Sequence, residues 1–347
     1  MPASRPRLVQ RSEYRWGLAA AILAIACLAV GCVDQVLRAD FTRADRSLLE
    51  SPAMHLIMCG TGGTLADPQR AGPCTAIIAA GRFFLVDLGP GAWEGADLAN
   101  LPLDGLYGVL FTTFLADDIA DFGETMTRSW IAGRPARLQV YGPPGTARLV
   151  ADISDAYRLD VAMRLSRHDP AVLRPDLAGA DAHEFALGET DGSAVVYEQD
   201  GLCITAFSIG AVGTVASVGY RFDYKGRAIV IAGHAKQHPN VLRFAKGADV
   251  LVHEAANSLM VERGITVMDE VGRTRLSTFS HEMLKRHATP REIAEVARDA
   301  GVGQLILTRL YPPPNSLLRK WVFLQGVRAI FPNTVLGEDG MRVRLDP

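Results

Sequence analysis

Short apolar segments, broken by glycine or proline, recur after residue 53, and they constrain the fold more than any other feature. Examples are HLIMCG, TAIIAA, RFFLVDLG and LYGVLFT, and later CITAFSI, RAIVIAG and DVLVHEA. Runs of this length are typical of buried strands. Segments with helical spacing lie between them, among them TARLVADISDAYRLDVAMRL and TPREIAEVARDAG. The alternation predicts a layered α/β domain.

Length and composition limit what such a chain can be. With 347 residues, 48% of them hydrophobic, it can form one large domain or two small ones with a proper core. A net charge of −2 creates no field that would attract nucleic acid or an anionic membrane surface. The cysteines at positions 27, 32, 59, 74 and 203 show no metal-like spacing, so neither a zinc knuckle nor a disulfide scaffold is predicted.

The N-terminal segment is predicted to attach the protein to a membrane. Residues 1–15 are basic, and residues 16–33, WGLAAAILAIACLAVGCV, contain no charge. As a helix they would extend about 27 Å, enough to cross a hydrocarbon core. The preceding arginines place the N-terminus in the cytoplasm and the rest of the chain on the extracytoplasmic, periplasmic side. Alternatively, residues 29–32 form a lipoprotein processing site with a lipidated Cys32. A polar linker, residues 34–53, then leads to a domain at 54–347.

Six motifs follow one another in this domain: CGTGG, VDLGPG, YGPPG, GYRFDYKGR, GADVLVHEA and ATPREIAEVARDAGVGQLILT. In this order they resemble the metallo-β-lactamase fold, and most closely its ribonuclease Z and arylsulfatase-like branch. The resemblance covers about residues 54 to 345. It implies a four-layer αβ/βα sandwich with the active site at the strand ends, where two metal ions activate a water for hydrolysis.

The same resemblance indicates that most metal ligands have been replaced. The family's Thr-His-x-His-x-Asp-His loop corresponds to residues 112–118, of which only the aspartate is retained. The corresponding ligand positions are Thr113, Leu115, Asp117, Asp118, Ala211, His234 and Arg309. Leucine and alanine cannot coordinate a metal, so one of the two metal subsites is absent.

Two interpretations of the remaining cavity follow. In the first, no metal binds, and Arg309 neutralises Asp117 or Asp118 in a buried ion pair with His234 nearby, because a guanidinium is permanently protonated and would repel a metal cation. In the second, Asp117, Asp118 and His234 hold a single zinc or manganese ion.

A possible proton shuttle also matches the family. Glu254 and His287 correspond to its paired glutamate and histidine, and His253 precedes the glutamate. These side chains could act as general acid and base. Equally, His253 and Glu254 could only satisfy buried backbone groups at the end of a strand. His281 also falls at a position where relatives carry histidine, but no role is assigned to it.

These observations leave two functions open. One is a membrane-anchored pseudo-hydrolase that serves as a binding module for a small molecule or a protein. The alternative is an active metal-dependent hydrolase of an ester, a sulfate ester or a phosphodiester. Residues 169–200 contain eight acidic residues and the single base Arg174, a composition that would repel a phosphate backbone. Nucleic acid is therefore not an expected partner.

Overall fold

The computed structural model describes residues 33–38, 42–188, 192–212 and 215–347. They belong to two units, of which the first ends at Asp45 and the second extends from Arg46 to Pro347. Residues 33–38, in the first unit, are helical. Apart from Val33, the predicted membrane segment lies outside the described residues, as does Cys32. No helix among the residues described is both long and apolar enough to cross a membrane.

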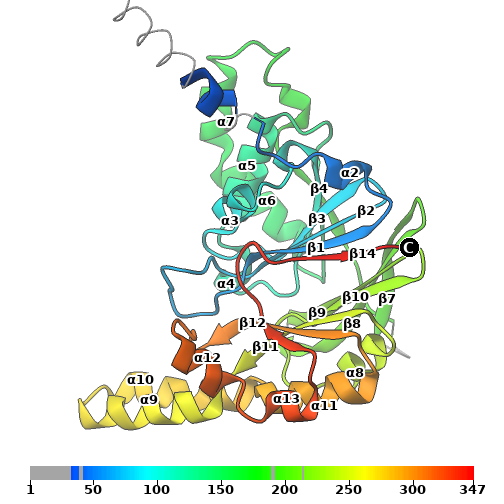
Figure 1. Cartoon of the computed structure of the whole chain (residues 1–347). Helices are drawn as coiled ribbons and strands as arrows, with labels where there is room; N and C mark the ends of the chain where they lie inside the picture. Colours follow the sequence, from blue (N-terminus) through cyan, green and yellow to red (C-terminus); the bar gives the residue numbers. More distant parts are fainter. Residues whose placement is uncertain (1–32, 39–41, 189–191, 213–214) are drawn as a thin grey trace, which may run out of the picture. The chain divides into compact units, whose positions relative to one another are not determined.

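Two seven-stranded mixed sheets form the centre of the second unit (Figure 1). The first sheet has, in spatial order, β14 (Arg342–Leu345), β1 (Met54–Gly60), β2 (Cys74–Ala79), β3 (Arg82–Val86), β4 (Leu106–Leu110), β5 (Leu138–Gly142) and β6 (Ala180–Glu184). The second has β7 (Ser193–Gln199), β8 (Leu202–Val212), β9 (Val215–Tyr224), β10 (Arg227–Ile231), β11 (Val250–Ala256), β12 (Gln304–Tyr311) and β13 (Thr334–Leu336).

The two sheets repeat one pairing pattern. The order β14-β1-β2-β3 is antiparallel and β3-β4-β5-β6 is parallel. In the same way β7-β8-β9-β10 is antiparallel and β10-β11-β12-β13 is parallel. The second unit is therefore one sandwich with two similar halves.

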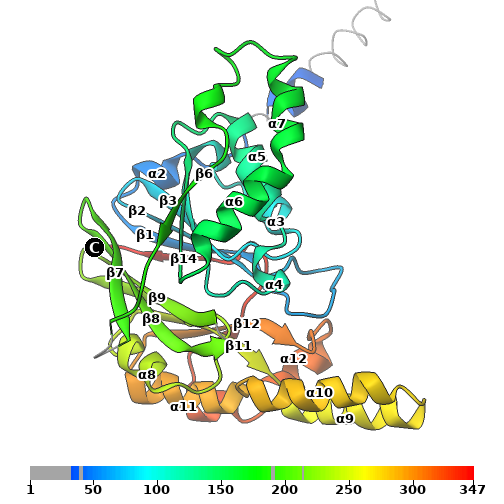
Figure 2. The same cartoon turned by 180° about the vertical axis from the view of Figure 1, so that it is seen from behind.

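Helices cover the outer face of each sheet, as Figures 1 and 2 show. On the first sheet they include α3 (Ala92–Leu98), α5 (Phe122–Ala132) and α6 (Thr146–Ala156), and on the second α8 (Pro239–Ala245), α11 (Pro290–Ala300) and α13 (Val327–Ile330). The shorter or peripheral elements are α2 (Ser47–Glu50), η1 (Leu103–Gly105), α4 (Ala116–Ile119), α7 (Arg158–Leu165), η2 (Pro175–Leu177) and α12 (Leu317–Phe323).

Alternating side chains build the layers. Along β1, Leu56 and Met58 contribute to the core between the sheets, whereas Ile57 and Cys59 join the core under the outer helices. This follows from the two-residue period of a strand. The predicted four-layer sandwich is confirmed. The buried side chain of Leu48 in α2 packs in the outer core, so the compact unit begins within the segment predicted as a linker.

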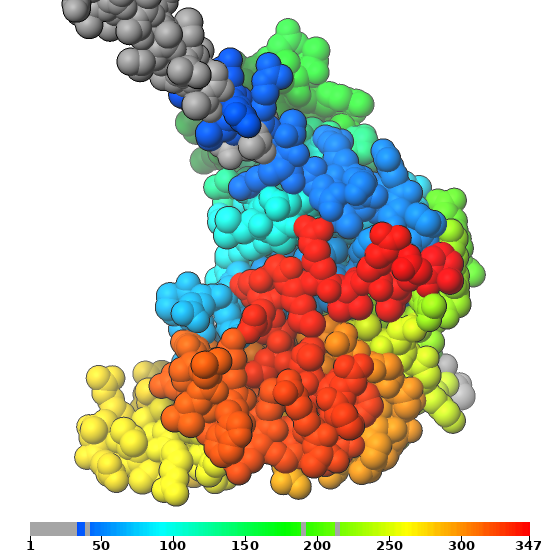
Figure 3. All heavy atoms as spheres, in the orientation of Figure 1, coloured from blue at the N-terminus to red at the C-terminus, as the bar shows by residue number. Residues whose placement is uncertain are grey.

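A helical hairpin was not predicted from the sequence. The helices α9 (Ser258–Glu270) and α10 (Thr274–Arg286) pack side by side and protrude from the sandwich (yellow in Figure 3). Asn257 caps α9, because its side-chain oxygen accepts a hydrogen bond from the backbone N–H of Met260 at 2.9 Å. The C-terminal end of α10 leads directly to His287.

A buried disulfide joins Cys59, in β1, to Cys74, the first residue of β2. The expectation that the cysteines would form no disulfide framework is wrong for this pair. Their separation of 15 residues matches no motif. It is the antiparallel pairing of β1 with β2 that brings the two Cα atoms to 5.0 Å from each other.

Candidate functional site

Arg309 is the centre of a buried ion-pair network at the strand ends. Its Nη1 donates to Asp118 Oδ1 and its Nη2 donates to Asp87 Oδ2. All three side chains are buried, with exposed fractions of 7%, 0% and 2% for Arg309, Asp118 and Asp87. One planar guanidinium thus serves two carboxylates, for which its fork of donors is suited.

Threonines complete the network. Asp87 accepts hydrogen bonds from the backbone N–H and the hydroxyl of Thr112, both at 2.8 Å. Thr113 donates its hydroxyl to Asp118 Oδ2. The residue at the first of the family's histidine positions therefore supports a carboxylate instead of a metal.

Backbone strain marks both ends of the ion pair. Arg309 has φ 48° and Asp87 has φ 60°, values in the left-handed region that side-chain-bearing residues rarely adopt. Such conformations cost about 1–3 kcal/mol each and persist only where the surroundings hold them. Gly63 lets the loop after β1 pack directly against the Arg309 backbone. A Cβ at position 63 would lie only 3.1 Å from the Arg309 carbonyl oxygen, closer than most Cβ contacts.

Charge in the network is not fully balanced. Burial, reinforced by the neighbouring Asp118, raises the pKa of Asp87 to about 7, although Arg309 acts in the opposite direction. Burial alone would lower the pKa of Arg309, but the Asp118 and Asp87 carboxylates outweigh it and raise the pKa. Arg309 is therefore permanently charged, while Asp87 can gain a proton in mildly acidic solution.

Asp117 is not part of this network. Its Oδ2 accepts a hydrogen bond from the Thr64 hydroxyl at 2.8 Å. Of the two partners predicted for Arg309, the structure places Asp118 against it and Asp117 elsewhere. Asp87 was missed as a site residue, and the only available signal was its place in the VDLGPG motif, immediately after a predicted strand.

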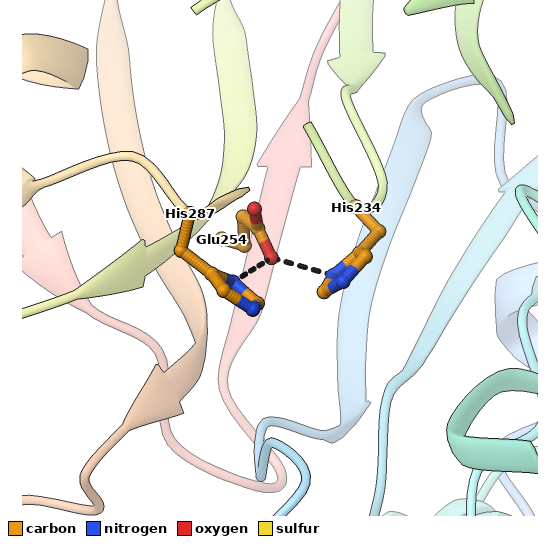
Figure 4. A group of neighbouring side chains, drawn as sticks. All are labelled: His234, Glu254 and His287. Carbon is orange, nitrogen blue, oxygen red and sulfur yellow. Dashed lines mark hydrogen bonds and ion pairs between the residues drawn. The ribbon is translucent and has the colours of Figure 1, made fainter. Parts of the chain in front are cut away.

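A second cluster is centred on Glu254, which lies in β11 and is completely buried (Figure 4). Its Oε2 lies 2.7 Å from Nδ1 of His234 and 2.9 Å from Nδ1 of His287. His234 reaches this position because Gly233, at φ 61°, passes so close to Thr112 that a Cβ would lie 2.7 Å from the threonine Cβ. Glu254 and His287 are thus brought together as predicted, and His234 joins them.

Electrostatics couple these three side chains. Burial would raise the pKa of Glu254, but His234 and His287 hold it well below its usual range. Burial would likewise lower the pKa of His234, yet the Glu254 carboxylate raises it. The cluster therefore retains a carboxylate as acceptor and favours a protonated His234.

His253 and His281 lie outside this cluster. The Nδ1 atom of His253 lies 2.8 Å from the backbone oxygen of Glu254, and burial lowers the pKa of its ring. Adjacent side chains of a strand point to opposite faces, so His253 cannot share the role of Glu254. His281 is exposed on α10. The structure therefore does not bring His253 into the predicted proton shuttle.

The side chains at the family's metal positions do not fit a dinuclear centre. Thr113, Leu115 and Ala211 offer no strong ligand, and Asp118 is engaged by Arg309. Asp117, Asp118 and His234, the predicted mononuclear set, are not gathered as ligands either, because each contacts a different partner. Among the described residues, the potential ligand atoms that lie within 4.8 Å of one another are those of His234, Glu254 and His287.

A pocket of about 390 Å³ adjoins the Glu254 cluster. Leu115 and Ala211 line it, together with His234, His287 and Asp117. α10 contributes Phe279, Met283 and Arg286. Lys236 lies on the loop after β10, where its Nζ donates to the Lys285 backbone oxygen of α10 at 3.0 Å. The pocket has a size typical of small-molecule sites.

Comparison with known proteins identifies relatives along most of the chain. No family model matches. Ribonuclease Z of Mycobacterium marinum is 31% identical over 266 residues, covering 75% of this chain and 87% of that protein. Ribonuclease Z of Mycolicibacterium paratuberculosis is 29% identical over 296 residues, covering 84% and 99%.

Solved structures share the fold. The metallo-β-lactamase fold protein YhfI of Bacillus subtilis superposes with a TM-score of 0.58 at 15% identity, covering 85% of this chain and all of that one. The short form of human tRNase Z gives a TM-score of 0.58 at 18% identity, covering 83% and 98%.

Removing the guanidinium should strongly destabilise the domain. We expect Arg309→Ala to lower the free energy of unfolding by about 3 kcal/mol or more, since it leaves two buried carboxylates without a cation. Urea denaturation followed by tryptophan fluorescence measures this. As a control, Arg298→Ala removes an exposed arginine paired with Asp299 and should change stability by no more than about 0.5 kcal/mol. Equal effects of the two substitutions would contradict the interpretation.

The raised pKa of Asp87 predicts a pH dependence. Its folded pKa lies above the value of about 4 in an unfolded chain, so folding takes up a proton between about pH 4 and pH 7. The contribution of Asp87 to stability therefore falls as pH rises through this window. We expect the free energy of unfolding, measured relative to that of Asp87→Asn, to decrease from about pH 4.5 to about pH 7.5. With the exposed Asp299→Asn as reference instead, the difference should show no such decrease, because Asp87 is present in both proteins and its contribution cancels.

Proposed function

This chain belongs to the ribonuclease Z branch of the metallo-β-lactamase superfamily, and because Arg309 supplies the positive charge at its centre, we propose that it is a ligand-binding protein without the dinuclear hydrolytic site. The observation that carries this proposal is the ion pair of Arg309 with Asp87 and Asp118. A metal placed at these carboxylates would have to displace a guanidinium and would meet Thr113, Leu115 and Ala211 in place of histidines.

We propose further that the domain works outside the cytoplasm, held on a membrane by residues 16–33. The arginines that precede this apolar segment support the orientation. The disulfide between Cys59 and Cys74 supports it independently, because disulfides persist mainly in oxidising compartments.

A second candidate is a metal-dependent hydrolase with a single zinc or manganese ion. The ribonuclease Z relatives favour it, since they are named for a hydrolytic activity. So does the convergence of His234, Glu254 and His287 in the structure. In this alternative those three residues would hold the ion, which would supply Lewis-acid chemistry. The acidic composition of residues 169–200 argues against nucleic acid as the ligand in either case.

Metal content separates the two candidates. We expect the purified full-length chain to contain only traces of zinc, manganese or iron by mass spectrometry. We also expect no chelator-sensitive hydrolysis of p-nitrophenyl esters of acetate, sulfate or phosphate, or of bis(p-nitrophenyl) phosphate. The matched variant is His287→Ala, which removes one ligand of the second candidate and leaves the Arg309 pairs intact. A near-stoichiometric metal that this variant loses, together with chelator-sensitive turnover, would establish the hydrolase instead.

The proposed location can be tested through the cysteines. In cells, Cys59 and Cys74 should resist alkylation until a reductant is added, whereas the partly exposed Cys203 should react after unfolding without reductant. Alkaline phosphatase fused to the C-terminus should be active, because this reporter folds only in an oxidising compartment. An inactive fusion and freely alkylated Cys59 and Cys74 would place the domain in the cytoplasm.

A further inference from the structure

We propose that the pocket beside the Glu254 cluster binds a small organic acid with an apolar body and one anionic head group. This inference rests on the proposed binding function and names its ligand class. Three features of the pocket carry it: an apolar wall, a pair of cations at its rim, and buried polar atoms without a partner.

The apolar wall is built from positions that the family uses for metal ligands. Leu115 and Ala211 line the pocket, and Ile209 lies beside Ala211. From the other side α10 adds Phe279 and Met283. Replacing metal ligands by aliphatic side chains converts the floor of a hydrolytic site into a surface that favours an apolar ligand, since burying such surface is favourable.

The rim carries two cations from separate elements. Lys236 follows β10 and Arg286 is the last residue of α10, and both are exposed and line the pocket. The negative groups nearby have partners already: Asp117 accepts from Thr64, and Glu254 is contacted by His234 and His287. Arg309 is fully engaged by Asp87 and Asp118. The Lys236 ammonium donates one hydrogen bond to the Lys285 backbone oxygen at 3.0 Å and keeps two further donors. Lys236 and Arg286 can therefore both contact an anionic head group.

Two buried polar side chains in the pocket lining have unpaired atoms. The Ser217 hydroxyl and the His287 Nε2 atom make no hydrogen bond to any described residue, although Ser217 is only 3% and His287 only 6% exposed. Buried polar atoms normally have partners. A carboxylate head group would accept a hydrogen bond from the Ser217 hydroxyl, which an uncharged hydrocarbon could not.

The test uses 2-naphthoate as the probe, with the full-length chain in lipid nanodiscs and empty nanodiscs as the blank. Two comparators separate the contribution of the rings from that of the charge: 2-naphthamide has the rings but no charge, and acetate has the carboxylate but no rings. By calorimetric titration we expect naphthoate to bind at least tenfold more tightly than either. Equal affinity for naphthoate and naphthamide, or no binding of naphthoate, would overturn the inference.

Variants locate the binding. The double variant Lys236→Met and Arg286→Met should bind naphthoate at least tenfold more weakly and should bind naphthamide with unchanged affinity. Arg275→Met is the matched control, because Arg275 is exposed on the same helix but does not line the pocket. An equal loss in the control, or no loss in the double variant, would overturn the assignment to this pocket.

Failure of this inference is distinguishable from failure of the proposed function. Naphthoate binding that a chelator does not change supports the proposed ligand class of the pocket, even if the metal assay shows that the protein is a hydrolase. Binding that disappears with the chelator would show that the carboxylate contacts a metal, and would overturn both. Metal-free protein that binds no naphthoate would overturn the ligand class alone.

Discussion

The ion pair of Arg309 with Asp87 and Asp118 is the interaction on which the rest of the site depends. Asp87 follows β3, Asp118 lies in α4 after β4, and Arg309 lies in β12. The network therefore ties the first sheet to the second. A buried carboxylate pair without a cation would be costly, so the arginine is required once the metal ligands are gone. The positive φ angles of Arg309 and Asp87 show that the backbone is strained at both residues where the ion pair forms.

Neighbouring features fit around this network. The disulfide from Cys59 to Cys74 closes the loop that carries Gly63 and Thr64. Gly63 packs against the Arg309 backbone, and Thr64 holds Asp117 away from the ion pair. Thr112 links Asp87 to the close approach of Gly233, which in turn positions His234 on Glu254. A continuous series of contacts therefore links the disulfide-closed loop, the ion pair and the Glu254 cluster.

Much of the fold could be predicted from sequence because buried strands and capped helices leave local signals. TPREIAEVARDAG, for example, forms α11 with a capping box between Thr289 and Glu292 and ends at Gly301. Long segments with weak patterns were less predictable: the hairpin of α9 and α10 was missed, and the helix predicted over residues 146–165 breaks at Tyr157. The Glu254–His287 contact was found by resemblance. Asp87 and the disulfide were missed, because both depend on strand pairing and not on local spacing.

The residues at the former metal positions have complementary roles. Leu115 and Ala211 remove ligands and line the pocket, Arg309 replaces the missing positive charge, and Thr113 turns from a ligand position into a hydrogen-bond donor for Asp118. Side chains in one network do not contribute additively. A histidine at position 309 would leave Asp87 and Asp118 short of a cation, while a metal would still lack the ligands that residues 115 and 211 cannot provide. Together these residues form a cation-neutralised centre beside an apolar pocket.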